Sequence, residues 1–133
     1  AQLGQLQSMR MLARYLPFAI TEIHTSDAVR CYETVAPMAR SLSLDMIYWT
    51  QLSEYAYEKD KKAAINVVND IIESEARALV CGHNPVIPGI VAKFIGKKNF
   101  KQLDHGLLPG EAFILHHRDG EVIAIDWMPA PDA

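Results

Sequence analysis

Two residues suited to binding an anion, Arg30 and His83, each follow a short, largely apolar segment of the sequence. Residues 79–85 run Leu-Val-Cys-Gly-His-Asn-Pro, which is typical of a buried strand that ends, turns and starts a helix. Asn84 suits the N-cap of that helix and Pro85 suits its first position. His83 would then lie at the carboxyl end of a strand beside free helix-start N–H groups, where open α/β sheets bind anions.

A second junction of the same layout precedes Arg30. Residues 22–25 are expected to form a short strand, with Ser26 as the N-cap of the next helix and Asp27 in its first turn. Arg30 would then be a cation near the positive end of a helix, a position that calls for an anionic partner. That partner is either a nearby carboxylate, Asp27 or Glu33, or a phosphate, whose oxygens match the donor fork of arginine.

The elements that position these residues follow from hydrophobic periodicity. Helices are expected over residues 4–16, 27–43, 61–74 and 86–95. Strands are expected over residues 22–25, 46–49, 78–81, 112–116 and 122–127, the last two joined by a turn at 118–120. Pro37 should kink or break the second helix, and Gly96 should end the fourth. Residues 51–60 and 97–110 are expected to be loops.

Strands that alternate with helices and end in a hairpin predict an α/β fold of three layers, α/β/α. The helical crossovers imply a mainly parallel sheet, to which the terminal hairpin adds antiparallel strands. A chain of 133 residues without a linker or repeat is expected to form a single domain, residues 1–133.

The composition of the chain limits the classes of binding partner that we expect. The net charge is −3 and no basic run occurs, so neither nucleic acid nor an anionic membrane surface is expected as a partner. No apolar stretch approaches the roughly 20 residues that span a bilayer, and the first residues do not resemble a signal peptide. Cys31 and Cys81 lack metal-type spacing and are expected to be small buried hydrophobes in a reducing compartment, which favours a cytoplasmic protein.

Several other chemistries are excluded by the sequence. It contains no Walker loop, no dinucleotide fingerprint and no serine nucleophile elbow. His116 and His117 are adjacent on an expected strand and would point to opposite faces, which makes them poor metal ligands. His24 and His105 are expected to be non-catalytic. No metal and no cofactor is therefore expected.

Three segments resemble the histidine phosphatase superfamily, which has the phosphoglycerate-mutase-like fold. Residues 25–34 match its Ser-x-x-x-Arg-x-x-x-Thr segment, residues 80–85 match its second-histidine segment, and residues 4–8 match the Gly-x-x-Gln-Ala that opens its first helix. The order and spacing fit, and the resemblance covers nearly the whole chain. Two subgroups are similar: SixA-type phosphohistidine phosphatases, and the C-terminal domain of actinobacterial MutT-type proteins, where a Nudix domain precedes it. Residues 81–88 and 108–117 favour the second.

The resemblance implies which residues would bind phosphate. Arg30 would hold the phosphoryl oxygens and His83 would donate a hydrogen bond to the same group, with Ser26 and the backbone N–H of Asn84 as weaker candidates. Many members use a carboxylate near residues 51–54 to protonate the leaving group. Glu54 is the candidate acid here, unless Gln51 occupies the equivalent place.

One departure from the family concerns the nucleophile. Members carry Arg-His-Gly on a strand that precedes the Gly-x-x-Gln helix, and that histidine becomes phosphorylated. This chain starts at the Gly-x-x-Gln segment, so the nucleophile and a central strand would lie outside it. The unpaired edges of such an incomplete sheet would favour a dimer.

The expected function is therefore a metal-independent phosphohydrolase domain that acts through a phosphohistidine. Its partner would be a phosphorylated small molecule, a nucleotide or a phosphohistidine protein, and a Nudix domain could lie upstream. The alternative is a non-catalytic phosphate-binding or interaction domain, such as the remnant of a MutT-type nucleotide hydrolase fusion.

Overall fold

The computed structural model describes residues 2–95 and 111–130 of the chain. In chain order the elements are α1 Gln2–Tyr15, η1 Leu16–Phe18, β1 Glu22–Ser26, α2 Val29–Leu42, β2 Met46–Trp49, η2 Thr50–Leu52, α3 Glu54–Lys59, α4 Lys61–Glu73, β3 Ala78–Cys81, α5 Val86–Ile95, β4 Ala112–Arg118 and β5 Glu121–Met128. The expected loop at 97–110 and the helix end at Gly96 lie outside the described residues. No helix within residues 2–95 and 111–130 is long and apolar enough to cross a lipid bilayer.

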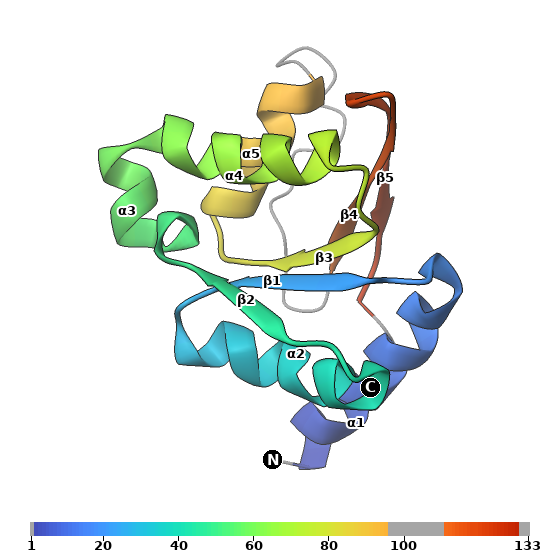
Figure 1. Ribbon diagram of the computed structural model, residues 1–133. Coiled ribbons are helices and arrows are strands. Elements are labelled where there is room, and N and C mark those ends of the chain that lie inside the picture. The colour runs from blue at the N-terminus through green and yellow to red at the C-terminus, as the bar shows by residue number, and fades with distance from the viewer. Residues whose placement is uncertain (1, 96–110, 131–133) are drawn as a thin grey trace.

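Three parallel strands form the centre of the molecule in the order β2-β1-β3. Ile23 of β1 lies opposite Met46 of β2 and Leu79 of β3. Helices α1 and α2 cover one face of this sheet, and α4 and α5 cover the other (Figure 1). The three-layer α/β/α architecture with a parallel sheet and an antiparallel hairpin, predicted from the sequence, is thus confirmed.

Two hydrophobic clusters hold these layers together, one on each face of the sheet. The cluster under α1 and α2 consists of Met11, Tyr15, Ile23, Val35, Met38 and Ala39. The cluster under α4 and α5 consists of Leu52, Tyr57, Ala64, Val67, Val68, Ile71, Ile72, Val86 and Ile90. Residues of β3 alternate between them: Leu79 packs against the first cluster, and Val80 packs against the second.

The C-terminal hairpin forms a sheet of its own instead of extending the parallel sheet. Leu115 and Val122 pack against the α4–α5 cluster, whereas Ala112 and Met128 pack against the α1–α2 cluster. Because these clusters lie on opposite faces, the hairpin must run past the side of the sheet that β3 borders (Figure 1). Within the described residues β3 pairs with β1 alone, and its apolar side chains are only half-buried.

Residues 51–60, expected to be a loop, contain η2 and the short helix α3. The Ser53 hydroxyl accepts a hydrogen bond from the backbone N–H of Ala56 at 3.1 Å, which caps α3. Leu52 and Tyr57 are buried on the α4–α5 side. A six-residue helix is too short to show a clear period, so only the capping serine signalled it in the sequence.

Three further expectations about helices were wrong in detail. Pro37 does not break α2, and the residue one turn before, Glu33, is exposed, so the carbonyl that loses its donor can meet water. Ala28, not Ser26, is the N-cap of α2. Helix α5 spans Val86–Ile95 as predicted, but Pro85 belongs to the preceding turn and not to the first helical position.

Candidate functional site

Ser26, Arg30 and His83 meet at one edge of the parallel sheet. Ser26 is the last residue of β1, Arg30 is the second residue of α2, and His83 follows β3 by two residues. Because β1 and β3 are parallel neighbours, their carboxyl ends meet at the same edge. The Nε2 atom of His83 lies 2.8 Å from Ser26 Oγ, and Arg30 Nε donates to His83 Nδ1 at 3.2 Å. Arg30 and His83 therefore touch directly, as the sequence predicted for one shared site.

The hydrogen bonds fix the protonation of His83. Burial first, and then the positive charge of Arg30, lower the pKa of this imidazole below its ordinary value of 6.5, which favours the neutral ring near pH 7. Since Arg30 Nε donates to Nδ1, the proton is assigned to Nε2, which donates to Ser26 Oγ. The same oxygen accepts from the backbone N–H of Ala28 at 3.3 Å. The imidazole is held at both nitrogens, with one of them facing a guanidinium.

The carboxylate partner of Arg30 is Glu54, rather than either of the two carboxylates proposed from the sequence. Arg30 Nη2 donates to Glu54 Oε1 at 3.0 Å, and the two side chains are 72% and 49% exposed. An exposed pair of this kind contributes about 0–1 kcal/mol, so a phosphate can compete for the same guanidinium edge. The expected acid thus lies against Arg30. The Gln51 amide oxygen instead accepts from the hydroxyl of its neighbour Thr50.

The two cysteines lie closer to this site than the sequence indicated. Cys31 is buried and Cys81 is half-buried, as small hydrophobes would be. However, Cys31 Sγ lies 3.5 Å from Nε2 and 3.7 Å from Nδ1 of His83. No pattern in the sequence predicts this contact between Cys31 and His83, because the contact depends on α2 crossing the end of β3.

Comparison with known proteins agrees with the fold and with the site segments. The sequence profile of the Histidine phosphatase superfamily (branch 1) matches residues 1–66, which include Ser26, Arg30 and Glu54. The structure superposes on that of mycobacterial glucosyl-3-phosphoglycerate phosphatase with a TM-score of 0.63 and 16% identity, over 98% of this chain and 86% of the other. Residues 1–66 are thus similar in sequence to the histidine phosphatase superfamily, and the fold of the chain is that of a phosphoglycerate-mutase-like protein.

A curated relative aligns with almost the whole of this chain. The 8-oxo-(d)GTP phosphatase of Mycolicibacterium smegmatis is 28% identical over 129 residues, which are 97% of this chain. The same alignment covers only 40% of the relative, so the chain spans less than half of that protein's length. Homology therefore extends over His83 as well as over the segment that the family profile matches.

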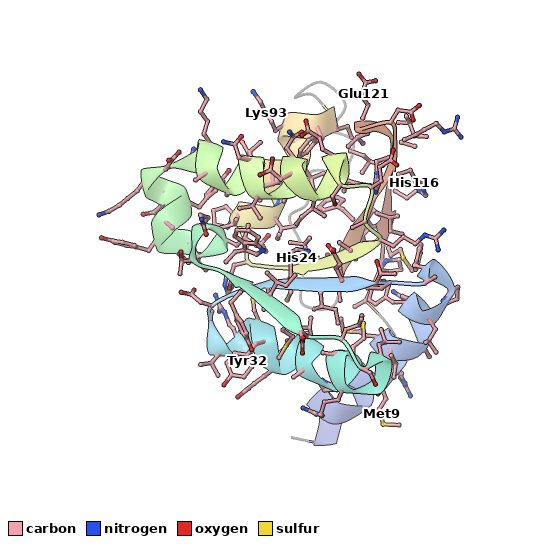
Figure 2. The ribbon with its side chains drawn as sticks, in the orientation of Figure 1. Met9, His24, Tyr32, Lys93, His116 and Glu121 are labelled. Atoms are coloured by element: carbon pink, nitrogen blue, oxygen red, sulfur yellow. The ribbon has the colours of Figure 1, made fainter. Side chains whose placement is uncertain are left out.

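His24 and His116 of this chain have surroundings that differ from those of His83. His24 is buried: Trp49 Nε1 donates to its Nδ1 at 2.9 Å, and its Nε2 lies 3.0 Å from Glu22 Oε1. His116 pairs with Asp126 at 2.8 Å on the exposed hairpin (Figure 2). No cluster of three or more metal-ligating side chains occurs in the part of the chain that the structure describes.

The remaining histidines and Asn84 add little to the site. His117 Nε2 donates to a backbone carbonyl, that of Ala76, at 3.2 Å. His105 lies outside the described residues. Asn84 is exposed in the turn directly after His83. The proposed role of its backbone N–H stays a prediction.

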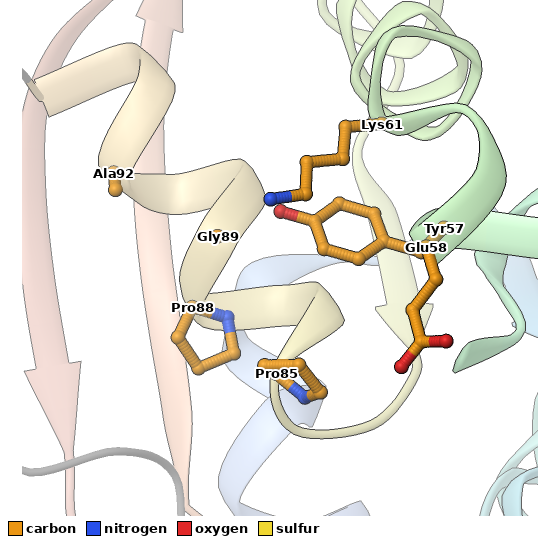
Figure 3. Close-up of a pocket in the computed structure, with 7 residues that line it drawn as sticks. All are labelled: Tyr57, Glu58, Lys61, Pro85, Pro88, Gly89 and Ala92. Atoms are coloured by element: carbon orange, nitrogen blue, oxygen red, sulfur yellow. The ribbon is translucent and has the colours of Figure 1, made fainter. Parts of the chain in front are cut away.

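A cavity of about 430 Å³ opens beside the site, between α5 and the junction of α3 with α4. It is lined by Tyr57, Glu58, Lys61, Pro85, Pro88, Gly89 and Ala92 (Figure 3). Pro85, which follows His83 by two residues, is part of this lining. A Cβ at Gly89 would overlap the Tyr57 hydroxyl, so the tyrosine occupies the space that only a glycine leaves free.

Proposed function

We propose that this chain is the phosphate-binding part of a phosphohydrolase domain that transfers a phosphoryl group through a phosphohistidine. The observation that carries the proposal is the contact of Arg30 with His83 at the carboxyl edge of a parallel sheet, in a chain whose residues 1–66 are similar to the histidine phosphatase superfamily. A phosphoryl group would take the place of Glu54 on Arg30 Nη2 and, in place of Ser26, accept the hydrogen bond from His83 Nε2. Both side chains would stabilise the charge that develops on the equatorial oxygens.

The nucleophile would come from a strand outside these 133 residues. None of the five histidines of this sequence lies in an Arg-His-Gly segment. Within residues 2–95 and 111–130 no strand pairs with the outer edge of β3, and the separate hairpin packs against both cores; both observations support a place for that strand between β3 and β4. A strand paired in parallel with β3 would end next to His83, within reach of a phosphoryl group held by Arg30.

For the substrate we propose a nucleoside polyphosphate. The support is the name of the relative, 8-oxo-(d)GTP phosphatase, together with a cavity large enough for a base beside the phosphate site. Lys61 at this cavity offers a cation for a second phosphate. The leaving group of a phosphoanhydride is a phosphate, which departs with little protonation, so hydrolysis of this substrate does not require Glu54 as a general acid. A domain preceded by a Nudix domain in a MutT-type protein fits the same substrate class.

The decisive experiment measures phosphate release with and without EDTA. The 133-residue chain is compared with the same chain carrying an N-terminal Arg-His-Gly strand from a superfamily member, with p-nitrophenyl phosphate and a nucleoside diphosphate as substrates. We expect EDTA-resistant turnover by the extended chain only. Arg30→Ala should abolish it, whereas Arg40→Ala, an exposed residue of the same helix, should not. EDTA-sensitive turnover, or turnover by the chain alone, would contradict the proposal.

The role of Glu54 is tested by comparing leaving groups. Glu54→Gln should slow hydrolysis of an aliphatic phosphomonoester, whose alkoxide must be protonated, far more than hydrolysis of a nucleoside diphosphate. Equal slowing of both substrates would assign Glu54 to positioning Arg30 instead.

The second candidate function is a non-catalytic phosphate-binding domain. It is supported by the contact of Arg30 with His83, which offers hydrogen-bond donors to an anion whether or not a nucleophile is present. Vanadate or phosphate binding that depends on Arg30, without turnover by the extended chain, would support this alternative.

A further inference from the structure

Two cysteines from different elements lie together under the phosphate site. Cys31 is the third residue of α2 and Cys81 is the last residue of β3. Cys81 Sγ donates a hydrogen bond to the backbone oxygen of Cys31 at 3.8 Å. Cys31 Sγ in turn contacts the ring of His83 at 3.5 Å. The two cysteines and the imidazole therefore form one continuous set of contacts.

The surroundings divide the two thiols into an acidic one and a protonated one. The neighbouring Cys81 thiol is the largest cause that lowers the pKa of Cys31, to about 7; burial opposes it, and the Ser26 hydroxyl and the charge of Arg30 lower it further. The proximity of Cys31, with burial, raises the pKa of Cys81. Cys31 also lies in the first turn of a helix, where the dipole favours a thiolate. A substantial fraction of Cys31 is thus thiolate near pH 7, whereas Cys81 retains its proton.

We propose that Cys31 and Cys81 form a peroxide-driven disulfide, which makes the floor of the phosphate site a reversible oxidation site. The Cys31 thiolate attacks one oxygen of hydrogen peroxide, and the O–O bond breaks. The departing hydroxide takes up a proton to become water, which leaves a sulfenic acid on Cys31. The Cys81 sulfur then attacks the Cys31 sulfur, the S–O bond breaks, and the hydroxide leaves as water with the proton of Cys81. In sum, two thiols and one peroxide give one disulfide and two waters.

The geometry suits a small oxidant and an internal resolving thiol. Cys31 is 4% exposed, which keeps bulky reagents from its sulfur. Its neighbour Arg30 is 72% exposed, so solvent lies one residue away from the thiolate. The resolving sulfur already contacts Cys31, so capture needs no large movement of α2 against β3. A larger thiol such as glutathione should compete poorly.

The disulfide should alter the phosphate site. Joining Cys31 to Cys81 withdraws the Cys31 sulfur from His83 and ties the start of α2 to the end of β3. Arg30 and His83 each lie within two residues of the joined positions, so their mutual placement would change. This consequence rests on the proposed function, whereas the formation of the disulfide does not.

The test treats the 133-residue chain with hydrogen peroxide and follows intact mass, peptide mapping and vanadate affinity. We expect the loss of two hydrogen masses, a Cys31–Cys81 peptide, and a fall of about tenfold in vanadate affinity that dithiothreitol reverses. Cys81→Ser should instead accumulate a sulfenic acid on Cys31, which dimedone traps once the oxidised protein is unfolded in urea, and Cys31→Ser should give neither product. Circular dichroism verifies that both variants fold.

The outcomes separate this inference from the function on which its consequence rests. An unchanged mass under conditions that oxidise free cysteine, or dimedone labelling of Cys81 in Cys31→Ser, would overturn the oxidation site. A disulfide that forms in a chain that binds no vanadate would support the oxidation site and contradict the phosphate site. A disulfide that leaves vanadate affinity unchanged would overturn the regulatory consequence.

Discussion

Two buried histidines, His24 on β1 and His83 just after β3, show how the same side chain can hold a fold together or prepare a site. They are 4% and 9% exposed, and each has contacts at both ring nitrogens. His24 is held by the Trp49 indole, which stacks on it with ring centroids 6.2 Å apart, and by Glu22. His83 is held by a guanidinium and a hydroxyl, and it also touches a thiol.

The difference lies in what the partners can do besides holding the ring. The indole of Trp49 has only one donor, and His24 uses it, so nothing remains there for a ligand. Arg30 has further donors, and its side chain is 72% exposed. A buried histidine thus indicates a binding site when its partners have further hydrogen-bond donors that face solvent. Burial alone does not distinguish a structural histidine from one in a site.

The largest expected effect is a loss of stability when His24, the structural histidine of the pair, is replaced. His24→Ala should lower the free energy of unfolding by about 2–4 kcal/mol, because it leaves a cavity and an unsatisfied Trp49 N–H. Vanadate affinity of the folded protein should stay the same. Urea unfolding and vanadate titration measure the two quantities, and weaker binding at unchanged stability would place His24 in the site.

The second prediction concerns the other histidine. His83→Ala should lower vanadate affinity about ten- to hundredfold, which corresponds to about 1.5–3 kcal/mol for a lost hydrogen bond to a charged group. The loss of unfolding free energy should be smaller than for His24→Ala. His116→Ala, on the exposed hairpin, is the matched control. If His83→Ala unfolds the protein while affinity holds, His83 is structural.

A smaller effect is expected from the hydroxyl that accepts from His83. Ser26→Ala removes a buried acceptor and should cost about 1–2 kcal/mol of unfolding free energy. The imidazole would then be less firmly oriented, so vanadate affinity should fall less than in His83→Ala. Ser41→Ala, exposed on α2, controls for the loss of a hydroxyl. An affinity loss as large as that of His83→Ala would make Ser26 a direct ligand.

The smallest effect is a pH dependence. The pKa of His83 is lowered in the folded state by burial and by Arg30, so below about pH 6.5 the unfolded chain takes up this proton first. Stability should therefore fall as the pH decreases from 6.5 towards the lower folded-state pKa, and should be free of this contribution above 6.5. Urea unfolding of the protein and of His83→Gln across this range isolates the effect. An identical slope in both proteins would assign it to other groups.

The local signals in the sequence were enough to predict the convergence of Arg30 and His83. Each follows a strand, and parallel neighbours bring their carboxyl ends together. The sequence could not predict that His83 bonds directly to Ser26, because His83 lies two residues past β3 and the path of that turn directs the imidazole. Nor could it predict the Cys31 contact, since one residue turns the side chain about 100° around α2 from Arg30. The sequence predicts a loop for the segment that holds Glu54, because its helix is too short to show a period.

The tight contact between Tyr57 and Gly89 has a consequence for how this domain can evolve. Tyr57 lies one helical turn from Glu54 on α3, and its hydroxyl fills the space above Gly89 on α5. Any larger residue at 89 must displace the Tyr57 ring; where the buried ring has no room to turn, α3 must shift from α5, which would move the Glu54 carboxylate relative to Arg30. A substitution at position 89 can therefore change the position of the Glu54 carboxylate without any change in the residues that would bind phosphate. Among related domains, side-chain size at 57 and 89 should vary in opposite directions.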